Sequence, residues 1–338
     1  MFHSLCVAAV VEETPDARSI VFDVPPALRG EFAYLAGQFL TVRVDCDGEL
    51  LQRCYSLSSA PGCDEDPRVT VKRVKGGRVS NWLLARLRAG DRVDVMGPQG
   101  RFVLDQTDAP LLFFAAGSGV TPILSLLKTA LTTTSRSATL LYANRSADSV
   151  IFRDELASLQ RASSQRLRVV HRFDGEHGPL DERSVRALGA EHRSASCYVC
   201  GPGPFMGLVE RALVESGVET ERIRTERFAL GATASPASPS QVNGAAPEYV
   251  DVELRGSRHR VAYRSGQTLL QAARDAGLDA PYSCEEGFCG CCAADLLEGK
   301  VSMAADDALS EAEKRRGMIL PCQSRPVTAR CTFRFVDS

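Results

Sequence analysis

Four cysteines near the end of the chain have a spacing that could hold a metal cluster. Cys284, Cys289 and Cys292 share one short loop, and Cys322 arrives later, in the pattern C-x4-C-x2-C-x29-C. This is the ligand spacing of a plant-type 2Fe–2S cluster, which carries one electron at a time. It fits such a cluster better than the paired C-x2-C knuckles of a zinc site. The spacing therefore predicts that this part of the chain moves electrons.

Two features beside this loop leave alternatives open. Cys291 lies between two proposed ligands and could pack or replace a neighbour, but the four-ligand spacing excludes it without strain, so we treat it as a non-ligand. The acidic pair Glu285 and Glu286 could steer a basic partner surface, or it could be a solvated loop face.

A glycine-rich turn at residues 116–122 follows an apolar stretch and opens a helical pattern. Gly117 and Gly119 would let backbone N–H groups approach a pyrophosphate, and the helix N-terminus would favour its charge. We expect Thr121 to be the N-cap and Pro122 to take the first helical position. Because Pro122 replaces the third glycine of the dinucleotide fingerprint, a plain strand–helix turn is the alternative.

A second glycine-rich turn, at residues 200–206, also lies between a strand and a helix and includes Cys200 and Gly201. In a parallel sheet both turns lie at the carboxyl ends of strands, where ligands bind. Two such turns in one domain favour a nucleotide site.

Residues 53–59 place a cation, an aromatic ring and several hydroxyl groups on one short strand. Strand alternation divides the side chains into two faces, namely Arg53, Tyr55 and Leu57 on one and Cys54, Ser56 and Ser58 on the other. A flavin needs a phosphate partner, a stacking ring and a hydrogen bond at its reactive nitrogen, although an ordinary barrel strand remains the alternative.

The turn at residues 76–80 enters a helix, with Ser80 expected as a capping residue, and offers a second anion site.

The surrounding patterns predict three domains joined by one linker. Residues 1–105 contain short alternating stretches separated by Gly, Pro and Asp, which predict an antiparallel barrel or sandwich. Residues 106–230 alternate apolar strands with helices and predict a parallel sheet. Strands are expected at residues 111–115, 138–142, 167–170 and 197–199, and helices at residues 121–131 and 205–216. Residues 231–247 are small and uncharged and predict a flexible linker before a domain at residues 248–338.

The overall composition is that of a globular protein. The 338 residues are 44% hydrophobic and 24% charged, which is ordinary for a chain with packed cores. A net charge of −2 argues against nucleic-acid or anionic-membrane partners. Residues 1–6 lack the features of a signal peptide, and the apolar run at 111–116 is too short to span a bilayer. We expect a protein of the reducing cytoplasm with no membrane insertion.

Taken in order, the motifs resemble the ferredoxin–NADP reductase superfamily. The resemblance is closest to oxygenase reductase components with a C-terminal plant-type ferredoxin domain, such as those of 3-ketosteroid 9α-hydroxylase and phenylacetyl-CoA epoxidase. It is carried by the cysteine set and by the motifs at residues 53–58, 76–80, 117–122, 200–206 and 226–228. It implies a multidomain fold: an antiparallel β-barrel flavin domain, an α/β parallel-sheet nucleotide domain and an α+β (β-grasp) ferredoxin domain. Pro122 belongs to the pattern of this superfamily.

The resemblance also implies roles for individual residues. Ser56 would approach flavin N5, Cys200 would lie beside the nicotinamide and Phe228 would cover the flavin, although Cys200 could also be a buried strand cysteine. The cofactor-binding residues would be Arg53, Tyr55, Ser56, Leu57, Ser58, Lys72, Gly76, Gly77, Val79, Ser80, Gly117, Gly119, Thr121, Pro122, Arg172, Cys200, Gly201 and Phe228. The cluster ligands would be Cys284, Cys289, Cys292 and Cys322.

The implied activity is electron transfer from NAD(P)H through FAD and a 2Fe–2S cluster to a separate oxygenase. The resemblance favours FAD over FMN and implies a Rieske or di-iron partner acting on a steroid, aromatic or acyl-CoA substrate. Asp174 would oppose a 2′-phosphate at Arg172, so NADH is slightly favoured over NADPH. We expect a monomer whose linker lets the cluster domain move. The alternatives are a stand-alone NAD(P)H oxidase or reductase of a small-molecule acceptor, and a redox-sensing module.

Overall fold

The computed structural model divides into two compact units, residues 1–228 and residues 229–338. It describes residues 1–228, 247–285, 287, 289–306, 308–309 and 311–336. The predicted linker at residues 231–247 lies outside the described residues, except for residue 247. The two units are therefore described one at a time.

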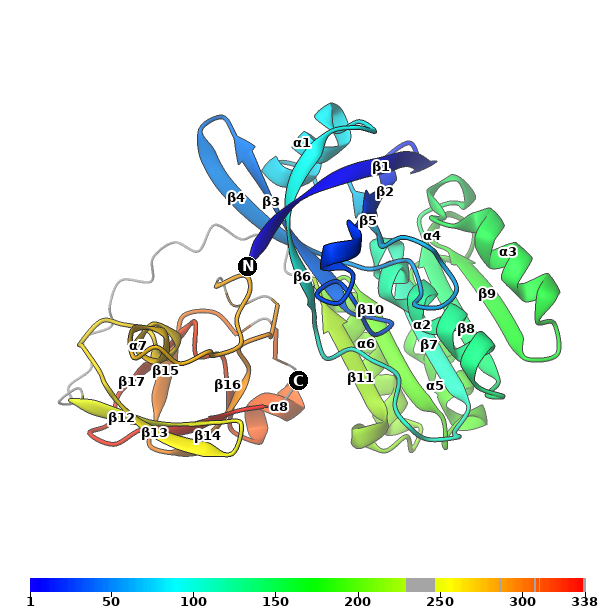
Figure 1. The fold of residues 1–338 in the computed structure, drawn as a ribbon. Coiled ribbons are helices and arrows are strands. Elements are labelled where there is room, and N and C mark those ends of the chain that lie inside the picture. Colours follow the sequence, from blue (N-terminus) through cyan, green and yellow to red (C-terminus); the bar gives the residue numbers. More distant parts are fainter. Residues whose placement is uncertain (229–246, 286, 288, 307, 310, 337–338) are drawn as a thin grey trace. The chain divides into compact units, whose positions relative to one another are not determined.

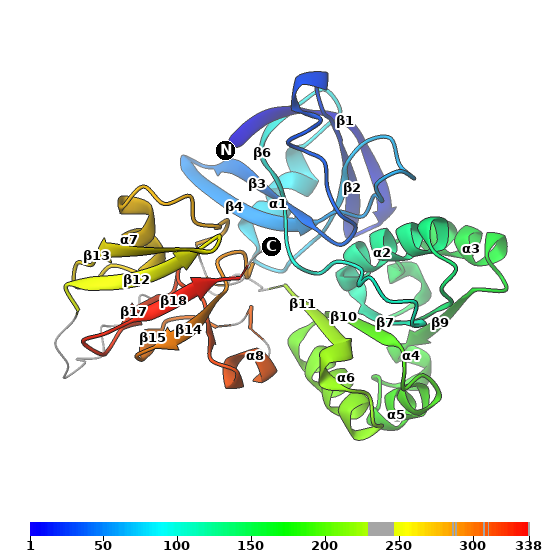
Figure 2. The ribbon, with the colours of Figure 1, turned by 60° about the horizontal axis from the view of Figure 1, so that its bottom comes forward.

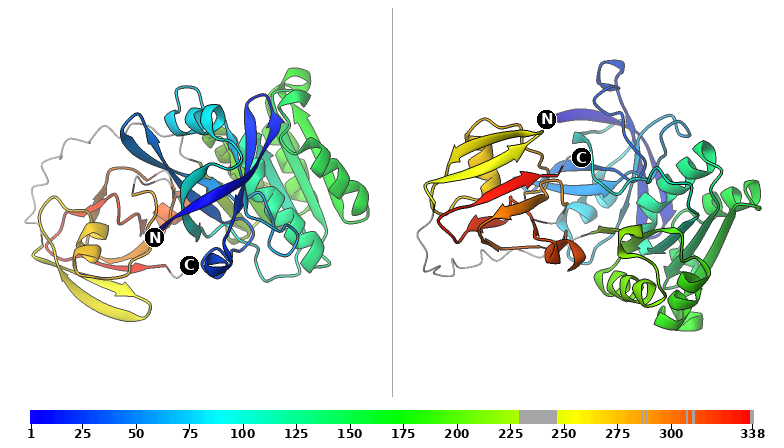
Figure 3. Two further views of the ribbon diagram at one scale, coloured as in Figure 1. Left: turned by 45° about the horizontal axis from the view of Figure 1, so that its top comes forward. Right: turned by 90° about the horizontal axis from the view of Figure 1, so that it is seen from below.

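An antiparallel sheet of six strands forms the first part of unit 1–228, in the order β4-β3-β6-β1-β2-β5 (Figure 1). Its elements are β1 (Phe2–Thr14), β2 (Ala17–Asp23), η1 (Pro26–Leu28), β3 (Phe39–Cys46), β4 (Glu49–Ser56), β5 (Arg68–Lys72), α1 (Arg78–Arg86) and β6 (Arg92–Gln99). Register shifts between β1 and β2 accompany the curvature of the long strand β1 (Figure 3). The Ser58 N–H donates to the Arg68 carbonyl oxygen at 2.7 Å, which joins the end of β4 to β5. The predicted antiparallel barrel is thus confirmed.

The interior of the barrel follows the period of two that strands impose. Leu40, Val42 and Val44 of β3 are all buried, and so are Val93 and Val95 of β6. Helix α1 covers this interior with its own buried apolar residues, Val79, Leu83 and Leu84.

A parallel sheet of five strands forms the second part of the unit, in the order β11-β10-β7-β8-β9. Its strands are β7 (Leu111–Ala116), β8 (Ala138–Asn144), β9 (Leu167–Phe173), β10 (Ser196–Gly201) and β11 (Ile223–Arg227). The connections contain η2 (Gly117–Gly119), α2 (Val120–Thr133), η3 (Ala147–Ser149), α3 (Arg153–Ala162), α4 (Asp174–His177), α5 (Glu182–Glu191), α6 (Gly203–Glu215) and η4 (Thr220–Arg222). The strand order reverses between β7 and β10, and such a switch point is where open α/β sheets bind ligands.

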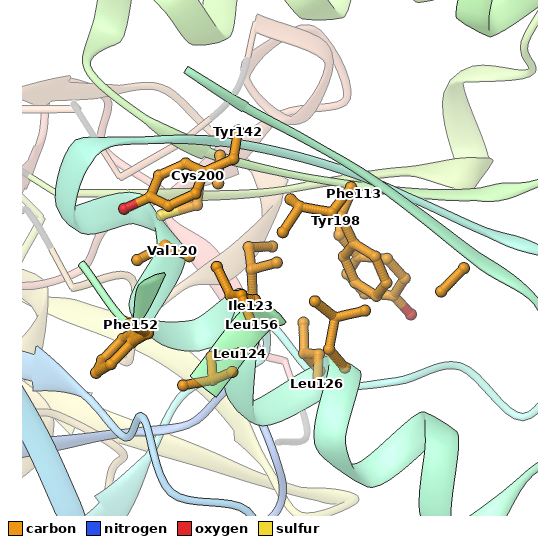
Figure 4. Packing of buried hydrophobic residues seen from close by; sticks show 14 of the residues in the cluster. Phe113, Val120, Ile123, Leu124, Leu126, Tyr142, Phe152, Leu156, Tyr198 and Cys200 are labelled. Atoms are coloured by element: carbon orange, nitrogen blue, oxygen red, sulfur yellow. The ribbon is translucent and has the colours of Figure 1, made fainter. Parts of the chain in front are cut away.

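Helices cover both faces of this sheet (Figure 2). Phe113 of β7 packs with α2 and α3 in one buried cluster, which Figure 4 shows from close by. Leu112 and Phe114 point the other way and pack against Met206 and Val209 of α6. Burial on both faces explains why β7 is a continuous apolar run in the sequence.

The starts of three helices differ from the sequence predictions. Helix α2 begins at Val120, so Thr121 is not its N-cap and Pro122 takes the third helical position, not the first. The positive φ of Gly117 (54°) starts the short turn η2 that leads into the helix. The Thr121 hydroxyl instead donates to the Ser118 carbonyl oxygen at 3.0 Å. Ser80 lies inside α1, where its hydroxyl accepts from the Val74 N–H at 3.3 Å rather than capping the helix. Helix α6 begins at Gly203, before the expected start at residue 205.

The described part of unit 229–338 contains a five-stranded mixed sheet in the order β13-β12-β18-β14-β16, beside a β15–β17 pair. Its elements are β12 (Tyr249–Leu254), β13 (Ser257–Ala262), α7 (Leu269–Asp275), β14 (Ala294–Glu298), β15 (Val301–Met303), α8 (Glu311–Arg315), β16 (Met318–Ile319), β17 (Ser324–Pro326) and β18 (Thr332–Phe335). Strands β12 and β18 are parallel, and the other neighbours are antiparallel. Helix α7 begins with a capping box between Thr268 and Gln271. This confirms the predicted α+β domain.

Candidate functional site

The two glycine-rich turns of the nucleotide domain lie against each other. Strands β7 and β10 are neighbours, so the turns that follow them leave the sheet side by side. A Cβ atom on Gly119 would lie 2.1 Å from the Cys200 carbonyl oxygen, and one on Gly201 would lie 2.8 Å from the Phe205 ring. The structure therefore brings Gly117, Gly119, Cys200 and Gly201 together at the switch point.

A cation from the barrel lies beside the first turn. The Lys72 ammonium group is 3.6 Å from the position that a Cβ atom on Gly117 would occupy. Asp16 lies 3.8 Å from the same ammonium group and also pairs with Arg145, at 3.2 Å. Burial lowers the pKa of Lys72, while the charge of Asp16 opposes that shift. A dinucleotide phosphate at this turn would gain a partly desolvated cation.

Ser56, at the end of β4, carries a buried polar atom without a partner. Its side chain is 3% exposed, and its hydroxyl oxygen has no hydrogen-bond partner among the described residues. Buried hydroxyl groups are normally satisfied, so this one fits the predicted hydrogen bond to a bound flavin. Tyr55 packs partly buried against the barrel core, and burial raises its pKa.

The residues after Ser56 turn inward. The Leu57 side chain lies in the barrel core, and its N–H donates to the Gln38 carbonyl oxygen at 2.8 Å. The Ser58 hydroxyl lies 2.8 Å from that of Thr70. Neither side chain is exposed, so Leu57 and Ser58 could contact a cofactor only through their backbone atoms. Their assignment as cofactor-binding residues stays a prediction.

The turn at residues 76–80 is held in shape by Asn81, which the sequence reasoning missed. The Asn81 carboxamide donates to the carbonyl oxygens of Gly77, at 2.6 Å, and Val74, at 3.1 Å. A Cβ atom on Gly77 would lie 2.7 Å from the Ser80 hydroxyl, so glycine is needed for this close approach. Asn81 lies one position after the motif, and that adjacency is the only sequence signal for it.

Cys200 is fully buried at one end of the nucleotide-domain core. Figure 4 shows it next to Val120 and Tyr142, and the Tyr142 hydroxyl donates to the Gly117 carbonyl oxygen at 3.0 Å. Burial raises the pKa of the Cys200 thiol, and the charge of Glu226 raises it further. The thiol is therefore neutral, which fits a packing role beside a ligand and not a nucleophile. Phe228 packs partly buried against the same core.

Arg172 lies apart from the two turns, on the edge strand β9. Its guanidinium group donates to Asp181, at 3.1 Å, and to the His177 carbonyl oxygen, at 3.0 Å. Asp174 begins α4 two positions later.

The cysteine loop and Cys322 converge in part. Cys284, Cys292 and Cys322 are buried, and Cys289 is partly buried. A hydrogen bond joins the side chains of Cys292 and Cys322. It raises the pKa of Cys292 and lowers that of Cys322. Cys291 donates its N–H to the Cys289 sulfur at 3.5 Å. Within the described ranges, no three His, Cys, Asp or Glu side chains meet closely enough to hold a metal ion, so the ligand assignment stays a prediction.

Gln323 is a further residue that the sequence reasoning missed. Its carboxamide nitrogen donates to the carbonyl oxygens of Glu285, at 2.8 Å, and Cys322, at 3.1 Å. It thus ties the cysteine loop to the distant fourth cysteine. Its position directly after Cys322 is the only signal in the sequence.

Comparison with known proteins assigns each part of the chain to a domain family. Residues 5–104 match the oxidoreductase FAD-binding domain, residues 113–211 the oxidoreductase NAD-binding domain, and residues 252–327 the 2Fe-2S iron-sulfur cluster binding domain. The ferredoxin reductase component of the 3-ketosteroid-9-alpha-monooxygenase of Rhodococcus rhodochrous is 43% identical, over 98% of this chain and 96% of its own. The chain belongs to the family of three-domain oxygenase reductases.

Two other proteins also match along almost the whole length of the chain. One component of the 1,2-phenylacetyl-CoA epoxidase of Escherichia coli is 37% identical, over 97% of this chain and 96% of its own. The solved structure of phthalate dioxygenase reductase covers 99% of this chain and 98% of its own, with a TM-score of 0.62 and 26% identity.

The family membership confirms the predicted three-domain fold, the oxidoreductase class, the cofactor set of FAD, NAD and a 2Fe–2S cluster, and the function of an oxygenase reductase component. Among the helices that the structure describes, none has the length and apolar character needed to cross a membrane. The individual site residues and the domain boundaries stay predictions.

Proposed function

We propose that this chain is the NADH-dependent reductase component of a monooxygenase that acts on a 3-ketosteroid. The observation that carries the proposal is the 43% identity to a 3-ketosteroid-9-alpha-monooxygenase reductase along almost the whole chain. The unpartnered buried hydroxyl group of Ser56 and the contact between the two glycine-rich turns support it.

In this proposal the chain's own residues bind and orient the flavin and the dinucleotide, and they exclude water. The turn at residues 76–80 and the cation of Arg53 hold the flavin phosphates, and Ser56 donates to the flavin ring. Lys72 and the turn at residues 117–119 hold the dinucleotide phosphates. Phe228 lines an apolar, water-poor path for the nicotinamide, and the buried Cys200 packs behind it. When bound, FAD accepts electrons in pairs from the nicotinamide and passes them on singly to the 2Fe–2S cluster.

NADH is proposed as the donor because the cation at the end of β9 is already engaged. Arg172 pairs with Asp181 and also binds a backbone carbonyl oxygen. A 2′-phosphate at this point would have to displace Asp181 and would lie near the carboxylate of Asp174. The ribose 2′-hydroxyl of NADH has no such conflict.

The partner is proposed to be an oxygenase of the Rieske or di-iron type, and the reductase is proposed to be a cytoplasmic monomer. An oxygenase that acts on an acyl-CoA is a second candidate, favoured by the 37% identity to the epoxidase component. Both candidates make the same demand on the reductase, which is delivery of single electrons.

The experiment is anaerobic reduction of the purified holoprotein, followed by reconstitution with purified oxygenase components. We expect NADH to bleach the flavin and cluster absorption faster than NADPH. We expect product with a 3-ketosteroid and its 9α-monooxygenase. Product only with phenylacetyl-CoA and its epoxidase would replace the proposed partner, and faster bleaching by NADPH would overturn the proposed donor.

A further inference from the structure

A chain of four charged side chains joins the barrel to the nucleotide domain. The Lys128 ammonium group of α2 lies 2.6 Å from Asp64 of the barrel and 2.8 Å from Glu155 of α3. The same Glu155 carboxylate binds the guanidinium group of Arg68, on β5, at 2.9 Å. Carboxylates and cations therefore alternate in the order Asp64, Lys128, Glu155, Arg68, and each domain contributes two of them.

These four side chains are largely shielded from water. The side chain of Lys128 is 11% exposed and that of Arg68 is 19% exposed. Shielded ion pairs are screened by salt much less than exposed ones. The Arg68 guanidinium also lies over the Phe152 ring, 5.2 Å from its centre, which holds it against the nucleotide domain.

On the barrel side, the network is bonded to the segment that follows Ser56. Arg68 donates a side-chain N–H to the Ser58 carbonyl oxygen at 3.3 Å and its backbone N–H to the Ser59 hydroxyl at 2.9 Å. Asp64 accepts from the Ala60 N–H at 2.6 Å. A shift of the network would therefore move a segment that begins only two residues after Ser56.

On the nucleotide side, the network is bonded to the helix that leaves the first glycine turn. Helix α2 begins at Val120, directly after Gly119, so Ser125 and Lys128 lie within its first three turns. The Ser125 hydroxyl donates to the Ser59 carbonyl oxygen at 2.5 Å. Both groups are fully buried, so this bond has no competition from water.

We propose that Ser125 and Lys128 are positioning residues, which hold α2 against residues 58–64 and so set the separation between the nucleotide turn and Ser56. The inference rests on the proposed function, in which a nicotinamide at that turn must meet a flavin at Ser56. Electron-pair transfer between two rings depends on their alignment, and a misplacement of about 1 Å can cost about 100-fold in rate.

The test is rapid-mixing reduction of the holoprotein by NADH, with the wild type and Lys128→Met compared over a range of NADH concentrations. We expect the limiting rate of flavin bleaching to fall by about 10- to 100-fold, with a much smaller change in the NADH concentration for half-saturation. We also expect a larger isotope effect with NADH deuterated at the transferred position. The cluster potential should not change.

Two further variants keep the result decisive if Lys128→Met loses its flavin. Ser125→Ala removes a single hydrogen bond, and Glu155→Gln weakens two ion pairs; each should slow the limiting rate. Arg186→Met is the matched control, because it removes a 3.0 Å ion pair with Glu215 between α5 and α6, on the opposite face of the same sheet. Its limiting rate should equal that of the wild type.

Two outcomes would overturn the inference in different ways. If the three network variants lower the melting temperature but keep the wild-type limiting rate and isotope effect, the network only stabilises the fold. If the wild type itself is not bleached by NADH, the proposed function fails first, and the inference fails with it.

Discussion

Gly119 and Cys200 pack so closely that no side chain fits between them. A Cβ atom on Gly119 would lie 2.1 Å from the Cys200 carbonyl oxygen and 2.4 Å from its carbon. Both are backbone atoms of Cys200, near the end of β10, so the conflict could be relieved only by separating the two turns. The same approach that excludes a side chain creates the surface on which we expect the nicotinamide nucleotide to lie.

Gly119→Ala is therefore expected to lower stability and nucleotide use together. We expect a loss of about 1–3 kcal/mol in the free energy of unfolding, because the added methyl group overpacks the turn. Reduction of the flavin by NADH should also slow. Denaturant unfolding and rapid-mixing reduction measure the two effects.

Gly207→Ala is the control for that substitution. Gly207 lies in α6, where an added Cβ would make only an ordinary 3.6 Å contact with Arg211. Its stability should be unchanged or higher by about 1 kcal/mol, because alanine is the better helix former. Equal stability of Gly119→Ala and the wild type would contradict the close approach.

Ser56→Ala should separate activity from stability. The Ser56 hydroxyl has no partner among the described residues, so removing it breaks no hydrogen bond of the protein. We expect the free energy of unfolding to stay within about 0.5 kcal/mol of the wild type or to rise. If the hydroxyl serves the bound flavin, the limiting rate of reduction by NADH should fall about 100-fold.

Ser19→Ala is the matched control for Ser56→Ala. Ser19 is equally buried in the same sheet, but its hydroxyl bonds Glu13 at 2.5 Å and Thr70 at 2.8 Å. Its loss should cost about 1–3 kcal/mol and leave the rate of reduction unchanged. A wild-type rate in Ser56→Ala would remove Ser56 from the proposed electron path.

The strands of the nucleotide domain could be predicted because strands that are buried on both faces appear in the sequence as short continuous apolar runs. The run at residues 111–115 became β7 (Leu111–Ala116) with a single residue added, since strands covered on both faces need continuous apolar residues. The start of α2 could not be predicted in the same way. It depends on the positive φ of Gly117 and the short turn η2, and an N-cap role for Thr121 satisfied the local pattern equally well.

Contacts between the two domains of unit 1–228 could not be predicted from the sequence around the residues that make them. Ser125 and Ser59 are 66 positions apart, and nothing in the composition around either residue marks the bond between them. The motif at residues 53–59 identified the segment, but the contacts that hold it appear only when both domains are packed. The cysteine spacing likewise predicts the four ligands, an assignment that stays a prediction. The contacts of Gln323 could not be predicted, because they depend on the loop meeting Cys322.

Asp105 should make the stability of the wild type fall at low pH. Its carboxylate pairs with Arg136 at 2.9 Å, and the two side chains are 8% and 1% exposed. Burial raises the pKa of Asp105, but hydrogen bonds from Ser196 and Thr107 and the charge of Arg136 outweigh it, so the net pKa is low. A lowered pKa adds stability above the unfolded value of about 3.9, and this stability is lost as the pH falls through the folded value.

Asp105→Asn should therefore cost about 3–5 kcal/mol near neutral pH, because it leaves a buried guanidinium group unpaired. The difference from the wild type should shrink below about pH 4, as the Asp105 carboxylate is protonated first in the unfolded chain and then, at lower pH, in the folded one. Urea unfolding across this pH range measures both. Asp94→Asn is the control: its pair with Arg43 is 2.8 Å long but more exposed, and should be worth at most about 1 kcal/mol. If the difference in the free energy of unfolding between the wild type and Asp105→Asn stays constant below about pH 4, the lowered pKa of Asp105 is contradicted.

Gln323 should raise the reduction potential of the cluster. Its carboxamide nitrogen lies 3.8 Å from the Cys322 sulfur, while its bond to the Glu285 carbonyl oxygen fixes its orientation. A hydrogen-bond donor near a ligand sulfur favours the reduced cluster, which carries one more negative charge. Loss of the donor should therefore lower the potential.

Gln323→Leu is expected to shift the midpoint potential negative, and Gln323→Glu further, because it replaces a donor by a negative charge. A tenfold change in the one-electron equilibrium corresponds to about 59 mV, and we expect shifts of roughly half that size or more. Potentiometric titration followed by electron paramagnetic resonance measures these shifts without turnover.

Gln267→Leu is the control. It removes a carboxamide of the same domain that bonds Asp275 at 2.7 Å, and should leave the potential unchanged. Identical potentials for the wild type and both Gln323 variants would show that the carboxamide only braces the loop.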